Sequence, residues 1–161
     1  MSKLIKYVVA VVITDPNRPD QFLTVKRPDD DPDLAGAVGL PAATMTAGEL
    51  PEQAAVRVCH EKLACVATPT RFIGMMFQKR NSYDIFLIDI EMTLTGGSQA
   101  DVKKAKTDHT AYTEQNWSAN PLDLMPSAKH GSCCSSIFLT DKGLLDKDEW
   151  VESLEGSDLV G

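Results

Sequence analysis

The sequence predicts one domain of mixed α and β structure. A β-branched apolar run, Tyr7 to Ile13, indicates a central strand. An amphipathic pattern from Pro51 to Ala64 indicates a helix, and two long β-like runs, 70–80 and 83–95, follow it. With 161 residues, of which 43% are hydrophobic, the chain is long enough for one core and too short for two. We therefore expect a single domain over residues 1–161.

The remaining elements follow from the same patterns and from the residues that interrupt them. Asn81-Ser82 separates two β-like runs and predicts a hairpin, while proline and glycine mark the ends of other elements. The polar segment 98–110 is expected to be a mobile loop, and 156–161 a frayed tail. In chain order we expect strands Leu4–Thr14 and Phe22–Arg27, the helix Pro51–Ala64, strands Thr70–Arg80, Tyr83–Thr95 and Ala111–Ser118, a turn at Pro121–Leu124, a helix Pro126–Leu139 and a final helix within Asp141–Leu154.

Composition excludes several classes of function. The net charge of −7, with no local basic cluster, argues against binding a nucleic-acid polymer. The first apolar run is too short to span a bilayer and precedes no small-residue cleavage site, so a cytoplasmic protein is predicted.

The four cysteines, Cys59, Cys65, Cys133 and Cys134, lack the spacing of a zinc site. We expect them to be reduced, with Cys59 buried and no disulfide between the adjacent Cys133 and Cys134.

The segment from Ala43 to Cys65 resembles the Nudix box. The family pattern is G-x5-E-x7-R-E-U-x-E-E-x-G-U, in which U is a bulky aliphatic residue. Glu49, Arg57 and Glu61 fall on this pattern in register. Together with the order of strands and helices, the resemblance covers about residues 4–140.

Four positions depart from the pattern. Ala43 and Ala64 replace the two glycines, Val58 replaces the glutamate after the arginine, and Lys62 replaces the second glutamate of the pair. The box is therefore degenerate.

The resemblance implies a three-layer α/β/α sandwich with a mixed β-sheet, and hydrolysis of a nucleoside diphosphate linked to another moiety with Mg²⁺ or Mn²⁺. It implies that Glu49 and Glu61 are surviving carboxylate positions. It also implies that Arg57 orients the helix or its glutamate. Since two metal-binding positions are lost, any ion would be held weakly by Glu61, with Glu52 or Glu114 completing the site.

A helical projection divides the predicted helix into two faces. Val58 falls off the apolar stripe, on the face that carries metal ligands in the family, and packing alone does not explain it there. Lys62 shares this face, so we expect its ammonium to take over part of the missing cation's role and contact a ligand; the alternative is an exposed lysine in a weak surface pair. The predicted core-facing stripe is Glu52, Ala55, Val56, Cys59 and Leu63, and the opposite face is Arg57, Val58, Glu61 and Lys62.

Other candidate residues have structural alternatives. Trp117 and Tyr112 could stack on a nucleobase, or pack at the core or its rim. His60 and His109 could act as general bases, or lie on the surface. The acidic run from Asp29 to Asp33 could add metal ligands, although a solvated loop is more common for such a run.

Three functional interpretations remain open. The chain could be an atypical, weak Nudix hydrolase, an inactive Nudix-fold module that binds a nucleotide or phosphorylated ligand, or a scaffold whose cleft is unused. In each case we expect a small-molecule partner or none, no membrane, and a homodimer as a common outcome for a domain of this kind.

Overall fold

The computed structural model describes residues 3–29, 35–99, 102 and 112–156. The regular elements in these ranges are β1 (Leu4–Asp15), β2 (Arg18–Lys26), β3 (Val38–Gly39), β4 (Ala42–Thr44), α1 (Pro51–Leu63), β5 (Val66–Lys79), β6 (Tyr83–Gly96), β7 (Glu114–Ser118), η2 (Pro121–Leu124), α2 (Met125–Lys129), α3 (Cys133–Asp141) and η3 (Lys147–Glu149).

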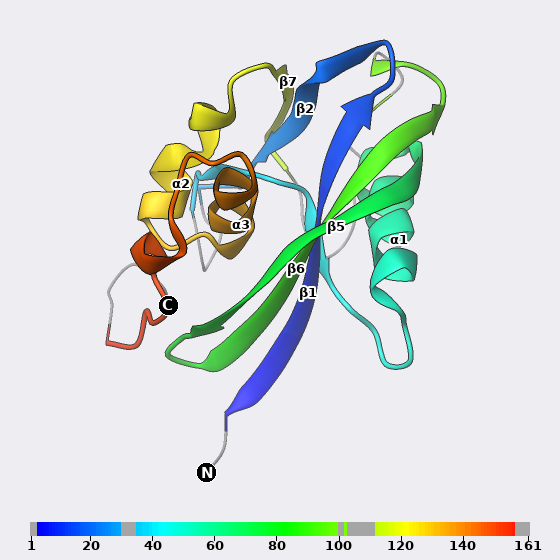
Figure 1. The fold of residues 1–161 in the computed structure, drawn as a ribbon. Coiled ribbons are helices and arrows are strands. Elements are labelled where there is room, and N and C mark those ends of the chain that lie inside the picture. The colour runs from blue at the N-terminus through cyan, green and yellow to red at the C-terminus, as the bar shows by residue number, and fades with distance from the viewer. Residues whose placement is uncertain (1–2, 30–34, 100–101, 103–111, 157–161) are drawn as a thin grey trace.

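The sheet is mixed, and β1 lies at its centre (Figure 1). Its strand order is β3-β2-β1-β6-β5, with β4 added beside β1 and β7 beside β2. β1 runs parallel to β6 and antiparallel to β2 and β4. The strands β5 and β6 form the predicted hairpin, although β5 begins at Val66 rather than Thr70.

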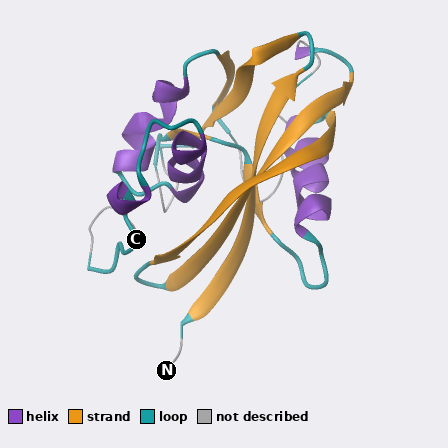
Figure 2. Ribbon diagram, viewed as in Figure 1, coloured by secondary structure: helices purple, strands orange, loops and turns teal. Residues whose placement is uncertain are grey.

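Helices cover both faces of the sheet, as Figure 2 shows. α1 packs on one face, over a core that includes Val9, Val11 and Ile13 of β1. α2 and α3 lie on the other face, over a core that includes Ala10 and Val12. Because β1 is buried on both faces, its sequence is a continuous apolar run. The expected three-layer α/β/α sandwich is confirmed.

The predicted helix over Pro126–Leu139 is divided into α2 and α3. Gly131 separates them with a φ of +102°, a left-handed conformation that a helix interior excludes. The side chain of Ser132 then caps α3 by accepting a hydrogen bond from the backbone N–H of Ser135. The prediction of one continuous helix was wrong because a local turn governs this segment.

The final helix predicted within Asp141–Leu154 is also wrong in its extent. α3 continues to Asp141, after which only the short turn η3 is helical in the described residues. Leu154 instead donates its backbone N–H to the carbonyl oxygen of Lys79, at 2.8 Å. This segment therefore takes its shape from the end of β5, a contact distant in sequence.

All four cysteines are free, as predicted, and all four are buried, whereas burial was predicted for Cys59 alone. Burial raises the pKa of the Cys133 thiol to about 12. In the described part of the chain, no helix is long and apolar enough to cross a membrane.

Candidate functional site

The candidate site is built around α1 and the segment before it. Gly48 turns the chain with a φ of +79°, and Pro51 occupies the first turn of α1, where its missing N–H costs nothing. The side-chain oxygen of Gln53 accepts a hydrogen bond from the backbone N–H of Leu50 at 2.9 Å. At the other end, Ala64 adopts a left-handed conformation with a φ of 49°. Glycine is usual in this conformation, which accounts physically for the glycine that the family pattern has here.

Arg57 and Glu49 form a bidentate ion pair. The Nε and Nη2 atoms of Arg57 donate to the two carboxylate oxygens of Glu49 at 2.8 and 2.9 Å, and Nη2 also donates to the carbonyl oxygen of Thr44 at 2.9 Å. The Glu49 carboxylate accepts a further hydrogen bond from the backbone N–H of Thr46. The hydrogen bond from Arg57 is the chief reason why the pKa of Glu49 falls to about 2. These contacts fix the segment before the helix onto the helix itself.

Glu61 is held much less firmly than Glu49. Its side chain is 52% exposed, and its carboxylate lies 3.5 Å from Nη1 of Arg57. Because the strong contacts of Arg57 go to Glu49, Glu61 remains open to solvent and to a ligand.

Val58 is fully buried, which contradicts the predicted faces of the helix. It packs in the core with Ala54 and Leu63, whereas Val56, predicted to face the core, is 44% exposed. The reason is that α1 contacts β4 as well as β1, β5 and β6, so the covered surface of the helix extends around to position 58. Packing therefore does explain the valine.

Lys62 points into the space between α1 and β4. Its Nζ donates to the carbonyl oxygen of Ala42 at 2.5 Å and lies 5.6 Å from the centre of the Tyr112 ring. The hydroxyl of Tyr112 in turn accepts a hydrogen bond from the backbone N–H of Ala42 at 3.0 Å. Lys62 is half-buried rather than exposed. A short strand and a backbone carbonyl carry no side-chain signature, so the sequence did not reveal Ala42 as its partner.

The two aromatic candidates have different positions. Tyr112 is 4% exposed, which supports its packing role. Trp117 is half-buried against the α1-side core and pairs with Leu23 of β2. It lines an open hollow whose other lining residues are Asp15, Asn17, Arg18, Ser98 and Gln99. That hollow does not include Lys62, Glu61 or Arg57, so Trp117 is not brought together with these residues of α1.

The residues of α1 do not fit a magnesium ion bound in the manner of an intact box. Val58 offers no oxygen, and Lys62 places an ammonium against the carbonyl of Ala42. Glu52 and Glu114 are exposed, and neither joins Glu61 in a cluster of three metal-ligating side chains among the described residues. The one such cluster there is exposed and distant in sequence from the box: Asp146, Asp148 and Glu149.

The remaining candidates add little to the site. His60 is exposed on α1, and Asp29 is exposed before the acidic run. His109 and the rest of that run, 30–33, lie outside the described residues.

Comparison with known proteins agrees with the box and the fold. The NUDIX domain family model matches residues 5–119, which is more than half of the chain. The chain therefore belongs to the Nudix family. No curated protein matches the sequence.

Solved structures of Nudix proteins have the same fold. The MutT protein from Methanosarcina mazei Go1 superposes with a TM-score of 0.66 at 15% identity, covering 89% of this chain and 96% of that one. A NUDIX hydrolase from Nitrosomonas europaea gives 0.64 at 18% identity, covering 89% and 93%. The ORF135 protein of E. coli gives 0.58 at 21% identity, covering 76% and 79%. At such low identity the likeness establishes the fold.

Proposed function

We propose that this Nudix-family protein is of the hydrolase type, with a metal site that is impaired or atypical. Its ligand is a nucleoside diphosphate linked to another moiety, and the diphosphate binds beside Lys62. Any turnover is weak and depends on Mg²⁺ or Mn²⁺. The observation that carries this proposal is the ammonium of Lys62 against the carbonyl oxygen of Ala42.

The charged side chains of α1 support a phosphorylated ligand. An ammonium has three donors, so Lys62 can keep its hydrogen bond to Ala42 while a second proton points toward a phosphate oxygen. The charge of Arg57 is largely matched by Glu49. We expect a diphosphate to contact the ammonium of Lys62, which lies between α1 and β4.

Binding in the absence of metal tests the role of Lys62. A panel of nucleoside diphosphate derivatives is titrated calorimetrically into the protein in excess chelator. We expect binding to persist and to weaken by about tenfold or more in Lys62→Ala, the scale of one charge-assisted contact. Lys129→Ala is the matched control, because its side chain is 60% exposed and lies on α2. Binding that requires added Mg²⁺, or that ignores the Lys62 change, would refute this role.

Turnover separates the enzyme from the binding module. The same panel is incubated with Mg²⁺ and with Mn²⁺, and phosphate-containing products are measured. Product that disappears in Glu61→Gln supports a weak hydrolase that uses Glu61. Binding without product supports the inactive module, and the absence of both supports a scaffold whose cleft is unused.

The cellular setting follows as part of the same proposal. A cytoplasmic protein with a small-molecule ligand fits the net charge of −7 better than one that binds a nucleic-acid polymer. An oligonucleotide that bound as tightly as the best nucleotide would argue against this.

A further inference from the structure

Part of the sheet face that carries α1 is exposed and apolar. Pairing places Tyr7 of β1 and Phe77 of β5 on either side of Phe86 of β6, so three aromatic rings lie in one row. Paired residues point to the same side of a sheet, and the next row, Val9 and Ile88, belongs to the core under α1. The row of rings therefore lies on the α1 side, beyond the helix.

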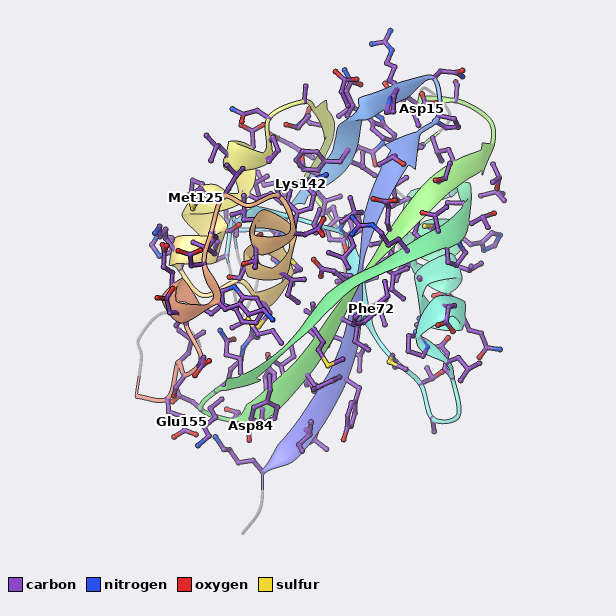
Figure 3. The ribbon with its side chains drawn as sticks, in the orientation of Figure 1. Asp15, Phe72, Asp84, Met125, Lys142 and Glu155 are labelled. Atoms are coloured by element: carbon purple, nitrogen blue, oxygen red, sulfur yellow. The ribbon has the colours of Figure 1, made fainter. Side chains whose placement is uncertain are left out.

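Five large side chains define this surface, which we call the apolar face. The register places Met75 beside Ile88 and Phe72 beside Ile90, both on the α1 side, and Ile5 one row beyond Tyr7. Figure 3 shows Phe72 near the middle of the sheet, where the strands cross. The exposed fractions are 39% for Ile5, 52% for Tyr7, 54% for Phe72, 49% for Met75 and 43% for Phe77.

The apolar face is as large as the largest apolar patches on monomeric proteins. A large apolar or aromatic side chain has roughly 200 Å² of surface, so five that are about half exposed contribute roughly 450–500 Å². That is at the upper end of what a monomeric protein leaves uncovered, and such patches mark binding surfaces.

Charges lie at the rim of the apolar face, and they have both signs. At the end of the sheet, Lys3 pairs with Asp84 at 3.0 Å and with Glu155 at 2.6 Å. Figure 3 shows Asp84 and Glu155 at this lower end. A ring of cations would favour an anionic membrane, but the chain carries a net charge of −7. A mixed rim can instead pair with its own copy across a twofold axis.

We propose that a second copy of this chain packs on the apolar face, so that the protein is a twofold-symmetric dimer. Two such faces supply roughly 900–1,000 Å² of apolar area. Homodimer interfaces are about 65% apolar, so the whole interface would reach about 1,400–1,500 Å², within the range of stable complexes. The dimer does not depend on the ligand proposed for Lys62.

A charge placed within the apolar face tests the proposal. Sedimentation is measured over a concentration series for the wild type, Phe77→Glu and Leu144→Glu. Leu144 is the matched control, since it is 42% exposed and follows α3 on the opposite side of the sheet. We expect a wild-type dimer of twice the 17.5 kDa chain mass and a dissociation constant raised at least tenfold in Phe77→Glu alone.

A measurement on the unmodified protein keeps the proposal open to refutation if Phe77→Glu does not fold. Oxidation of Met75 by peroxide should slow as protein concentration rises, because the dimer covers its sulfur, while oxidation of Met125 on α2 should not change. A wild type that remains monomeric overturns the proposal, as does a dimer that Leu144→Glu weakens and Phe77→Glu does not. Binding of the monomer to phospholipid vesicles through Phe77 would also overturn it, since a membrane would then cover the face.

Discussion

Asp89 is expected to make the stability of this protein depend strongly on pH. It lies on β6 between Ala10 of β1 and Gly74 of β5, on the face covered by α3. Asp89 is fully buried, and neither carboxyl oxygen has a hydrogen-bond partner in the described part of the chain. Burial is the main cause that raises its pKa well above the usual value, with the nearby Cys134 and Asp141 adding to the shift. The native protein therefore keeps a proton on Asp89 at pH values at which the unfolded chain begins to release it.

The size and sign of the effect follow from this proton. The unfolded chain releases it above a pKa of about 3.9, whereas the native state keeps it. The stabilisation of the native state by this proton is thus complete below the unfolded-state pKa. It is lost as the pH rises toward the native pKa. Over this window the free energy of unfolding falls by about 1.4 kcal/mol for each pH unit. The total free energy of unfolding of such a domain is roughly 5–15 kcal/mol, so the change over one or two pH units is easily measured.

Urea unfolding from pH 4 to 8 measures the effect. The free energy of unfolding of the wild type is compared with that of Asp89→Asn, whose side chain has the same volume and cannot titrate. The contributions of the other ionisable groups cancel in the difference between the two proteins. Asp89→Ala is the matched control, because it changes packing but should show the same pH dependence as Asp89→Asn. A difference between wild type and Asp89→Asn that stays constant over this range would show that Asp89 is ionised in the native state and refute the reasoning.

Two further predictions concern the ends of the box. Ala64→Gly should stabilise the protein by about 1 kcal/mol in urea unfolding, because glycine adopts the left-handed φ of 49° without strain; a loss of stability would mean that Ala64 is not strained there. Glu49→Gln should destabilise it by about 1 kcal/mol after allowance for solvent screening. Because the pKa of Glu49 is lowered, the difference in free energy of unfolding between the wild type and Glu49→Gln should be complete above pH 4.5 and should vanish as the pH falls toward 2. A difference that persists at pH 2 would contradict the role of the Glu49 charge.

Most of the fold could be predicted because its main elements have local signatures. β1, α1 and the β5–β6 hairpin each extend over nine residues or more, enough for a period to be recognised. By contrast, β3 and β4 have two and three residues, and no pattern can be read at that length. The split at Gly131 and the path of the chain to Leu154 depend on a turn and on a long-range contact, which periodicity does not contain.

The candidate site was predictable only where the partner was also a charged side chain in the motif. Arg57 was predicted to orient the helix or its glutamate, and its partner Glu49, eight residues earlier, is a charged side chain of the same motif. Lys62 has a partner twenty residues away, and this partner is a backbone carbonyl. Position 58 was misread because the apolar stripe was centred on Val56, and only the contact of α1 with β4 shows which side is covered.

The structural and the cation-binding parts of the box are physically separable in this protein. The contacts among Arg57, Glu49 and the Thr44 carbonyl hold the loop to the helix without any ion. At the two altered positions, two glutamates and a divalent cation would sum to zero charge, whereas Val58 and Lys62 sum to one positive charge with no ion at all. Under the proposed function, Lys62 attracts a diphosphate in the absence of metal, and the second cationic charge that would stabilise a departing phosphate is missing at these two positions. Under the proposed function, we therefore expect these two substitutions to favour retention of ligand binding and a loss of catalytic rate.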